Sequence, residues 1–320
     1  MGAARLDPDS AVRRTAGCGP WAALGKHLGM AMSVDRQLLR KLERFEIVPR
    51  GVHRGGQIGH RRSPSRGTGL EFADHKEYSA GDDIRYLDWN LYARLEELFI
   101  KVFEQDEALP IYILLDGSGS MGVGSPSKAL FGARMAAALA YVGLASQDHV
   151  RVSLFADGLI SSTKALAGKT RIYEILGFLD APAESGTNLA EAIESFSRDT
   201  RLPGVVFLIS DFLDPQGVIE GVRLLASRRF GVYALHLIAP EEAAPDLGGD
   251  VELRDIETGG TLHVPLRRDM AQRYAAFFKA HCDSLRSDLQ RYGARYVRLT
   301  TDQDLDDILF TRLPREGVFR

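Results

Sequence analysis

Short, continuously apolar segments alternate with amphipathic segments from Pro110 to the end of the 320-residue chain. Strands that are covered by helices on both faces are apolar along their whole length, and alternation of strand and helix builds a parallel sheet. The sequence therefore predicts an α/β fold with a doubly wound, mostly parallel sheet. The expected strands are 111–115, 150–155, 205–210, 232–238 and 294–299, and the expected helices lie near 128–146, 169–180, 188–199, 216–229 and 269–292.

The sheet is expected to lie in a main domain of residues 110–320. Two other parts of the chain are expected before this domain, and one is expected to be inserted within it. Residues 32–109 mix aromatic, arginine and carboxylate side chains, and they are expected to form a smaller N-terminal module. Near residues 250–266, two strand-like runs flank Glu257–Gly260, which predicts an inserted β-hairpin. Residues 1–31 show no helical or strand period and no apolar core of signal-peptide length, so we expect them to be disordered or dispensable.

Composition argues against several classes of function. The chain has 40 lysines and arginines against 43 aspartates and glutamates, so no overall field attracts nucleic acid or an anionic membrane. Its two cysteines, Cys18 and Cys282, lie too far apart to suggest a disulfide framework, which fits a reducing, cytoplasmic compartment. The most apolar window, 129–145, is interrupted by Arg134 and is expected to be a buried helix and not a membrane span.

The segment LLDGSGSMG, from Leu114 to Gly122, fits two motifs. Its glycines match the G-x-G-x-x-G fingerprint of dinucleotide-binding folds, in which a helix opens inside the motif and binds the pyrophosphate. Here the next helix is expected to begin later, with Ser125 as its N-cap and Pro126 at its first position. The acidic residue expected about twenty residues after the glycines is also misplaced, so the dinucleotide interpretation is disfavoured.

The same segment reads D-x-S-x-S, with Asp116, Ser118 and Ser120 at alternate positions, and this suggests a metal site. Thr187 and Asp211 fall near the carboxyl ends of other expected strands, where open α/β sheets bind their ligands. Neither is needed as a helix cap, because Asn188 and Asp214 are better placed to cap the helices that follow. Hydroxyl and carboxylate oxygens favour Mg²⁺ or Mn²⁺ over Zn²⁺.

In this order and at these strand ends, the segments resemble the von Willebrand factor A fold with its metal-ion-dependent adhesion site. The resemblance implies that Ser118 and Ser120 ligate the metal directly and that Thr187 does so directly or through water. Asp116 and Asp211 are then implied to act largely through water. Such a site leaves the cation under-neutralised, so its open position would attract an acidic residue of a partner protein.

Two further stretches, GTGLEFADHKEYSAGDDIRYLDWNLYARLEELFIKVFEQDEA and ELRDIETGG, resemble the bacterial domain-of-unknown-function 58 family. This similarity runs from about Gly55 onward. It implies an upstream module fused to a von Willebrand A domain, and partnership with a MoxR-type AAA+ ATPase and its client, for which such proteins act as adaptors or co-chaperones. Members often carry N-terminal transmembrane helices, and the sequence departs from that pattern.

Two alternatives to metal-dependent, non-enzymatic capture remain open at this point. A metal-dependent hydrolase would need a positioned base. His149, before a strand at the opposite sheet edge, and His236, inside the apolar run VYALHLI, are both expected to be structural. The other alternative is a metal-independent scaffold with a vestigial site.

A second acidic cluster lies in the N-terminal module. Asp82, Asp83 and Asp88 suggest a metal or an acid–base site, but Arg85 and Arg94 are close in sequence. Ion pairing and turn capping are therefore the expected roles of these carboxylates.

Overall fold

The computed structural model describes residues 36–320 apart from 50–52, 55–56, 59–61, 65–70, 81, 107, 157, 181–187, 245–249, 255–260 and 266–269. The prediction for residues 1–31 therefore lies outside the described residues, as does Thr187 of the predicted metal site.

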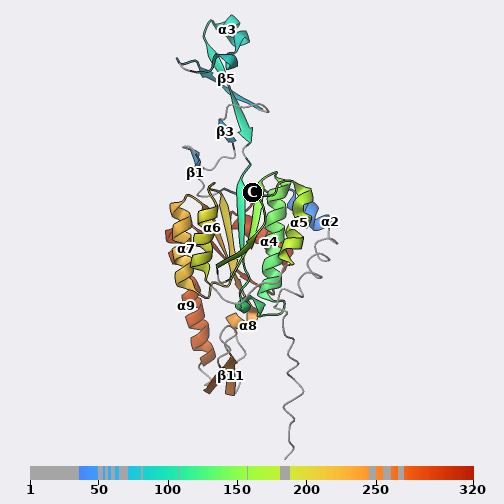
Figure 1. Ribbon diagram of the computed structural model, residues 1–320, viewed down its shortest axis with the longest axis vertical. Coiled ribbons are helices and arrows are strands. Elements are labelled where there is room, and N and C mark those ends of the chain that lie inside the picture. Colours follow the sequence, from blue (N-terminus) through green and yellow to red (C-terminus); the bar gives the residue numbers. More distant parts are fainter. Residues whose placement is uncertain are drawn as a thin grey trace, which may run out of the picture.

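A six-stranded sheet forms the centre of the molecule (Figure 1), in the order β13-β10-β9-β6-β7-β8. All neighbours pair in parallel except β7 and β8, which are antiparallel. This confirms the expected doubly wound, mostly parallel α/β sheet, and it adds the edge strand β8, which was not expected. The strands are β6 (Pro110–Asp116), β7 (His149–Ala156), β8 (Gly158–Ser162), β9 (Val205–Ser210), β10 (Gly231–Ile238) and β13 (Arg295–Thr300).

Helices cover both faces of this sheet. On one face, α4 (Lys128–Ala145) packs on β6 and β7, with α5 (Ile172–Leu179) and α2 (Arg36–Leu42) beside it. On the other face lie α6 (Leu189–Asp199), α7 (Pro215–Ser227) and α9 (Met270–Arg291). Alternate residues of β6 serve the two layers, since Ile111, Ile113 and Leu115 join one core and Tyr112 and Leu114 the other.

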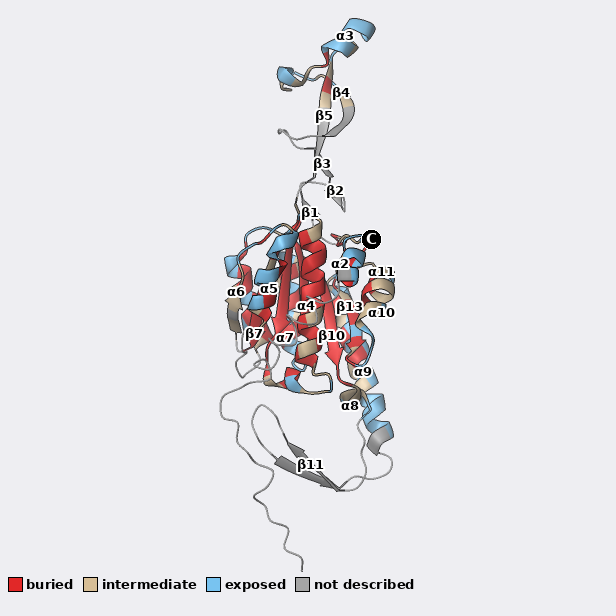
Figure 2. Cartoon of the chain, turned by 90° about the vertical axis from the view of Figure 1, so that its right-hand side faces the viewer, coloured by how far each residue is buried: buried red, intermediate tan, exposed pale blue. Residues whose placement is uncertain are grey.

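Helix α4 is long and apolar enough to cross a membrane by length and composition, but 83% of its 18-residue window is buried inside the protein. Figure 2 shows it as one of the most completely buried helices against the sheet. The expectation of a buried core helix is therefore confirmed for this segment.

The direction of winding reverses between β6 and β9. After β6 the chain builds β7 and β8 on one side, and it then returns to place β9 and β10 on the other side. At such a switch point the connections leave the two central strands in opposite directions and open a crevice beyond their carboxyl ends. The last residues of these strands are Asp116 and Ser210, so Asp116 and Asp211 of the predicted metal site lie at the switch point.

The N-terminal part of the chain contributes to two places. Strands β3 (Arg62–Pro64), β5 (Phe99–Asp106) and β4 (Glu71–Glu77) form an antiparallel sheet in that order. With α3 (Trp89–Leu95), β4 and β5 stand beyond the end of the main sheet at which β6 begins (Figures 1 and 2). Helix α2 instead packs on α4, where Leu38 and Leu42 belong to the main core.

The expected hairpin is present as β11 (Asp250–Arg254) and β12 (Thr261–Pro265), which pair antiparallel. It lies in the chain between the short helix α8 (Pro240–Ala243) and α9. After β13 the chain ends in the short helices α10 (Leu305–Asp307) and α11 (Leu313–Arg315). Near the terminus, Phe319 forms an isolated β-bridge with Ile47.

Candidate metal centre

Asp116 ends the central strand β6 with its side chain completely buried. Its Oδ1 accepts the backbone N–H of Ser118 at 2.8 Å, and its Oδ2 accepts the hydroxyl of Ser210 at 2.5 Å. Because Ser210 is the last residue of β9, this second bond joins the two strands at the switch point. The carboxylate is thereby fixed in direction before any ligand binds.

The hydroxyls of Ser118 and Ser120 lie 3.0 Å apart in the buried loop that follows β6. A short 3-10 turn, Gly119–Gly122, forms this loop, and the N–H of Gly117 donates to the carbonyl of Phe155 at 2.7 Å. The Ser118 side chain makes no capping bond to the turn. The structure thus brings the two predicted hydroxyl ligands together beside Asp116.

Helix α4 begins at Lys128, in agreement with the expected range 128–146 but two residues after the start at Pro126 that the predicted cap implied. Ser127, and not Ser125, is its N-cap, and its hydroxyl accepts the N–H of Leu130 at 3.2 Å. Pro126 is therefore outside the helix. Both serines are capping types, so the local sequence alone did not distinguish them.

Asp211 follows β9 and is only 3% exposed. Its Oδ2 accepts the ammonium of Lys128 at 2.7 Å, whereas its Oδ1 has no hydrogen-bond partner among the described residues. The next residue, Phe212, has a φ of 50°, which is strained for a bulky side chain. A buried carboxylate oxygen without a partner is costly, and it is a ready acceptor for a cation.

The negative charge of Asp211 affects the titration of the buried Asp116 carboxyl. The pKa of the Asp116 carboxyl is raised to about 6, first by burial and then by the negative charge of Asp211. Hydrogen bonds from Ser210 and Ser118 oppose that rise. A cation beside both groups would favour their charged forms.

Lys128 and Glu242 belong to this site, and sequence reasoning missed both. The Lys128 side chain is 0% exposed, and its Nζ forms ion pairs with Asp211 and with Glu242 of α8. A signal for Lys128 was present, because a lysine in the first turn of a helix faces the positive end of the helix dipole. Its acidic partners lie 83 and 114 residues away, so the sequence did not identify them.

Thr187 lies outside the described residues, but its neighbour Asn188 is described. Asn188 donates its backbone N–H to the carbonyl of Ala156, the last residue of β7, at 2.7 Å. It also caps α6 by accepting the N–H of Glu191 at 3.1 Å, and Asp214 caps α7 in the same way. Both predicted caps are confirmed, and Asn188 is anchored at the strand next to β6.

The described residues offer a set of oxygens that suits a small, hard cation. It comprises two hydroxyls at 3.0 Å and two buried carboxylates, one with an unpartnered oxygen. In the described part of the chain, no group of three or more histidine, cysteine, aspartate or glutamate residues could hold a metal. A cation here would therefore depend on the serine hydroxyls, and Lys128 already neutralises part of the acidic charge.

The other predicted candidates have structural partners. Lys76 pairs with Asp82, Arg85 with Asp83, and both His75 and Lys101 with Asp88. Asp83 and Asp88 also cap helical turns, which confirms the ion-pairing and capping interpretation, although the partners are mostly not the arginines expected.

The two histidines considered as catalytic bases lie elsewhere. His236 is buried in β10, and its Nδ1 lies 2.6 Å from the Tyr296 hydroxyl. Burial lowers its pKa to about 4. His149 is exposed at the start of β7, at the amino ends of the parallel strands, whereas Asp116 lies at their carboxyl ends.

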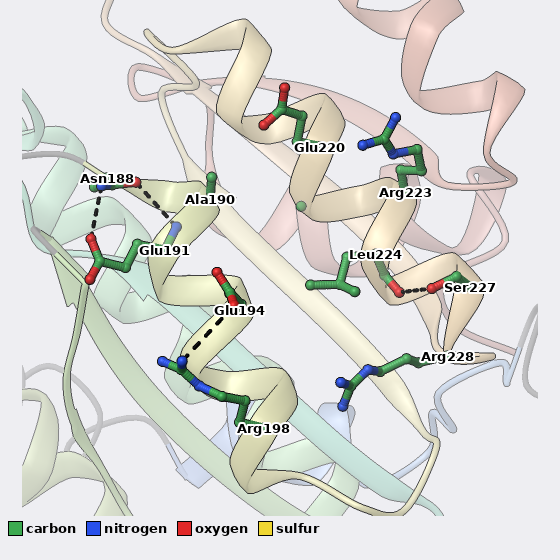
Figure 3. A pocket seen from close by; sticks show the side chains of 11 residues that line it. Asn188, Ala190, Glu191, Glu194, Arg198, Glu220, Arg223, Leu224, Ser227 and Arg228 are labelled. Carbon is green, nitrogen blue, oxygen red and sulfur yellow. Dashed lines mark hydrogen bonds and ion pairs between the residues drawn. The ribbon is translucent and has the colours of Figure 1, made fainter.

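A separate groove of about 850 Å³ runs between α6 and α7 (Figure 3). Glu191 lies near the start of α6 and Glu194 near its middle, and Arg198 and Arg228 lie toward the ends of the two helices. None of the described metal-site residues lines this groove, so it is a second surface feature and not part of the centre.

Comparison with known proteins identifies relatives of the chain. The family described as "Protein of unknown function DUF58" matches residues 74–284. The uncharacterized protein Rv1480 of Mycobacterium tuberculosis is 28% identical over 297 residues, which cover 89% of this chain and 92% of that protein. The uncharacterized protein MAV169 of Mycobacterium avium is 31% identical over 141 residues, covering 43% of this chain and 82% of that protein.

Solved structures show more distant similarity. The conserved hypothetical protein BatB from Bacteroides thetaiotaomicron is 21% identical and covers 65% of this chain and 97% of its own, with a TM-score of 0.43. The SpRpn10 VWA domain is 13% identical and covers 65% and 96%, with a TM-score of 0.36.

Proposed function

Because the chain belongs to the DUF58 family, whose function is unknown, we propose from its geometry that it is a metal-dependent protein-binding module. In this proposal Mg²⁺ or Mn²⁺ binds at Asp116, Ser118, Ser120, Thr187 and Asp211. The cation then captures an acidic side chain of a partner protein. The observation that carries the proposal is the buried Oδ1 of Asp211, which has no partner among the described residues and belongs to a carboxylate close enough to Asp116 to raise its pKa.

The division of labour among the residues follows from their contacts. Ser118 and Ser120 supply neutral oxygens, so the bound cation keeps part of its charge for the partner. Asp116 is held by the Ser210 hydroxyl and by the Ser118 N–H, so it orients the serine loop and supplies negative charge from the end of β6. When bound, the metal would supply the electrostatic attraction for the partner's carboxylate.

We further propose that the protein is a cytoplasmic adaptor or co-chaperone and not an enzyme. Its partners would be a MoxR-type AAA+ ATPase and that ATPase's client, as the family resemblance implies. Binding is favoured over hydrolysis by the positions of the two histidines considered as bases. His236 is buried with its Nδ1 at the Tyr296 hydroxyl, and His149 lies at the start of β7, away from the carboxyl end of the strands where Asp116 lies. Turnover of an ester or phosphate by the purified protein with Mg²⁺ would favour the hydrolase instead.

One observation favours a second candidate function, a metal-independent scaffold. The Lys128 ammonium already contacts Asp211, so the acidic pair has a cation from the chain itself. If that ion pair is permanent, partners would bind this surface without a metal.

The test of the proposal is capture of partners from the native host. Wild-type protein in Mg²⁺ is expected to retain partners that Asp116→Ala loses and that EDTA removes. Asp302→Ala is the matched control. Asp302 is an exposed carboxylate that follows β13, so it also lies at the carboxyl ends of the parallel strands. Recovery of the same partners by Asp116→Ala, or in EDTA, contradicts metal-dependent capture and favours the scaffold.

A further inference from the structure

Lys128 lies between two carboxylates that come from different parts of the chain. One is Asp211, which follows β9, and the other is Glu242 on α8. The ammonium has no exposure to solvent, and a buried lysine is tolerated only when its charge is paired. Its place at the first position of α4 adds repulsion from the helix dipole, so the two carboxylates are what hold it there.

Glu242 is positioned for this contact by bonds on both its side chain and its backbone. Its second carboxylate oxygen, Oε2, accepts the N–H of Ala239 at 2.8 Å. Its backbone carbonyl accepts the hydroxyl of Tyr274 on α9 at 2.8 Å. The carboxylate is therefore directed at Lys128, while 25% of the side chain remains exposed to solvent.

This arrangement reproduces the charges of an occupied adhesion site with groups of the chain itself. In the proposed function, a cation on Asp211 binds a carboxylate that arrives from another protein. Here the Lys128 ammonium takes the place of the cation on Asp211, and Glu242 takes the place of the carboxylate from the other protein.

We propose that Lys128 and Glu242 form an internal latch that competes with the metal at Asp211. This inference rests on the proposed function, because it regulates the same site. Lys128 neutralises Asp211 while the latch is closed, and Glu242 holds the ammonium in place. Metal binding requires the ammonium to leave Asp211, so the metal affinity of the resting protein is lowered by the strength of the Lys128–Glu242 pair.

The latch makes a prediction opposite to that of simple charge counting. Glu242→Gln removes a negative charge near the site, and Coulomb attraction alone would then weaken Mg²⁺ binding. Under the latch, the same change removes a charge-assisted bond that holds the competing ammonium. Mg²⁺ should then bind about tenfold more tightly, as the strength of such bonds indicates.

The experiment is calorimetric titration of Mg²⁺ into the full chain, with Glu241→Gln as the matched control. Glu241 is the exposed neighbour of Glu242, so this control makes the same charge change without removing the partner of Lys128. Tighter binding by Glu242→Gln, with Glu241→Gln unchanged from wild type, supports the latch. Equal or weaker binding by Glu242→Gln overturns it, as does a gain shared by both variants.

Lys128→Met separates failure of the latch from failure of the metal site. This variant removes the competing ammonium, so Mg²⁺ is expected to bind tightly and to raise its melting temperature strongly, even if it is poorly folded in EDTA. If wild type binds Mg²⁺ but Glu242→Gln shows no gain, only the latch is wrong. If neither wild type, Glu242→Gln nor Lys128→Met binds Mg²⁺ or Mn²⁺, the metal centre is wrong and the latch falls with it.

Discussion

The hydroxyl of Ser210 donates a 2.5 Å hydrogen bond to the buried Oδ2 of Asp116 and so joins the carboxyl ends of β9 and β6. The same Ser210 oxygen accepts the N–H of Phe212 at 3.0 Å, next to the strained backbone of that residue. One side chain thus links the two central strands and the turn that carries Asp211.

Ser210→Ala is expected to lower the free energy of unfolding by about 1.5–3 kcal/mol, the range for a hydrogen bond to a charged group. The loss arises because a buried carboxylate oxygen loses its donor. Denaturant unfolding measures the change. Ser227→Ala serves as the control, since its exposed hydroxyl donates to a carbonyl within its own helix and its loss should cost less than about 0.5 kcal/mol. Equal effects of the two changes would contradict the role assigned to Ser210.

Ser118→Ala and Ser120→Ala should each weaken Mg²⁺ binding by at least about tenfold, because each removes a proposed direct ligand. The measurement is the rise in melting temperature as Mg²⁺ is added, since a ligand at 100 times its Kd stabilises the folded state by about 2.7 kcal/mol. Ser125→Ala is the control, as Ser125 is exposed in the same loop. Unchanged Mg²⁺ stabilisation in both serine variants would exclude these hydroxyls as ligands.

Asp88 is expected to make the N-terminal module sensitive to strong acid. The hydrogen bond from His75, aided by the N–H of Leu91 and by Lys101, lowers the pKa of Asp88 to about 2. An aspartate in an unfolded chain titrates near 3.9, so this carboxylate stabilises the fold above that pH. The stabilisation is lost as the pH falls from about 4 through 2.

Trp89 reports this transition, because it follows Asp88 at the start of α3. In a Trp21→Phe background Trp89 is the remaining tryptophan of two, and its fluorescence should change below pH 4. Asp88→Asn removes the titrating group, so the transition should disappear. A transition of the same midpoint in Asp88→Asn would show that another group is responsible.

Two helical glycines should respond to alanine in opposite directions. A Cβ at Gly143 of α4 would lie 2.6 Å from Ile111 and 2.8 Å from Val150, so Gly143→Ala should destabilise the protein by about 1–3 kcal/mol. A Cβ at Gly177 of α5 would meet nothing within 4 Å, and Gly177→Ala should stabilise it by about 0.5–1 kcal/mol. Thermal unfolding of the two variants tests how closely α4 packs on β6 and β7. A change in stability of the same sign in both variants would contradict that packing.

Local patterns predicted much of this fold because its central strands are covered on both faces. Strand β9 matches the expected segment 205–210 at both ends, since every residue of it is buried and apolar or small. The caps at Asn188 and Asp214 were also predictable, because capping depends on residues three positions apart.

Contacts between distant segments were not predictable in the same way. The pairing of Lys128 with Glu242 joins residues 114 positions apart, and a single sequence does not reveal such a neighbour. The packing of α2 on α4 was also not predictable, because nothing in the sequence around Leu42 indicates whether it packs in the main core or in the N-terminal module. The edge strand β8, Gly158–Ser162, lacks the continuous apolar run that identified the others.

The path of the chain from β5 into β6 has a consequence for assembly. The N-terminal sheet carries α3, where Trp89 is 64% exposed and Leu95 is 54% exposed, and Asp116 lies at the far end of β6. The 7 residues of β6 alone span about 23 Å at about 3.3 Å per residue. The exposed apolar side chains of α3 and the buried Asp116 therefore lie at opposite ends of the path through β6, so a surface at one end is separated from the other by at least the length of that strand.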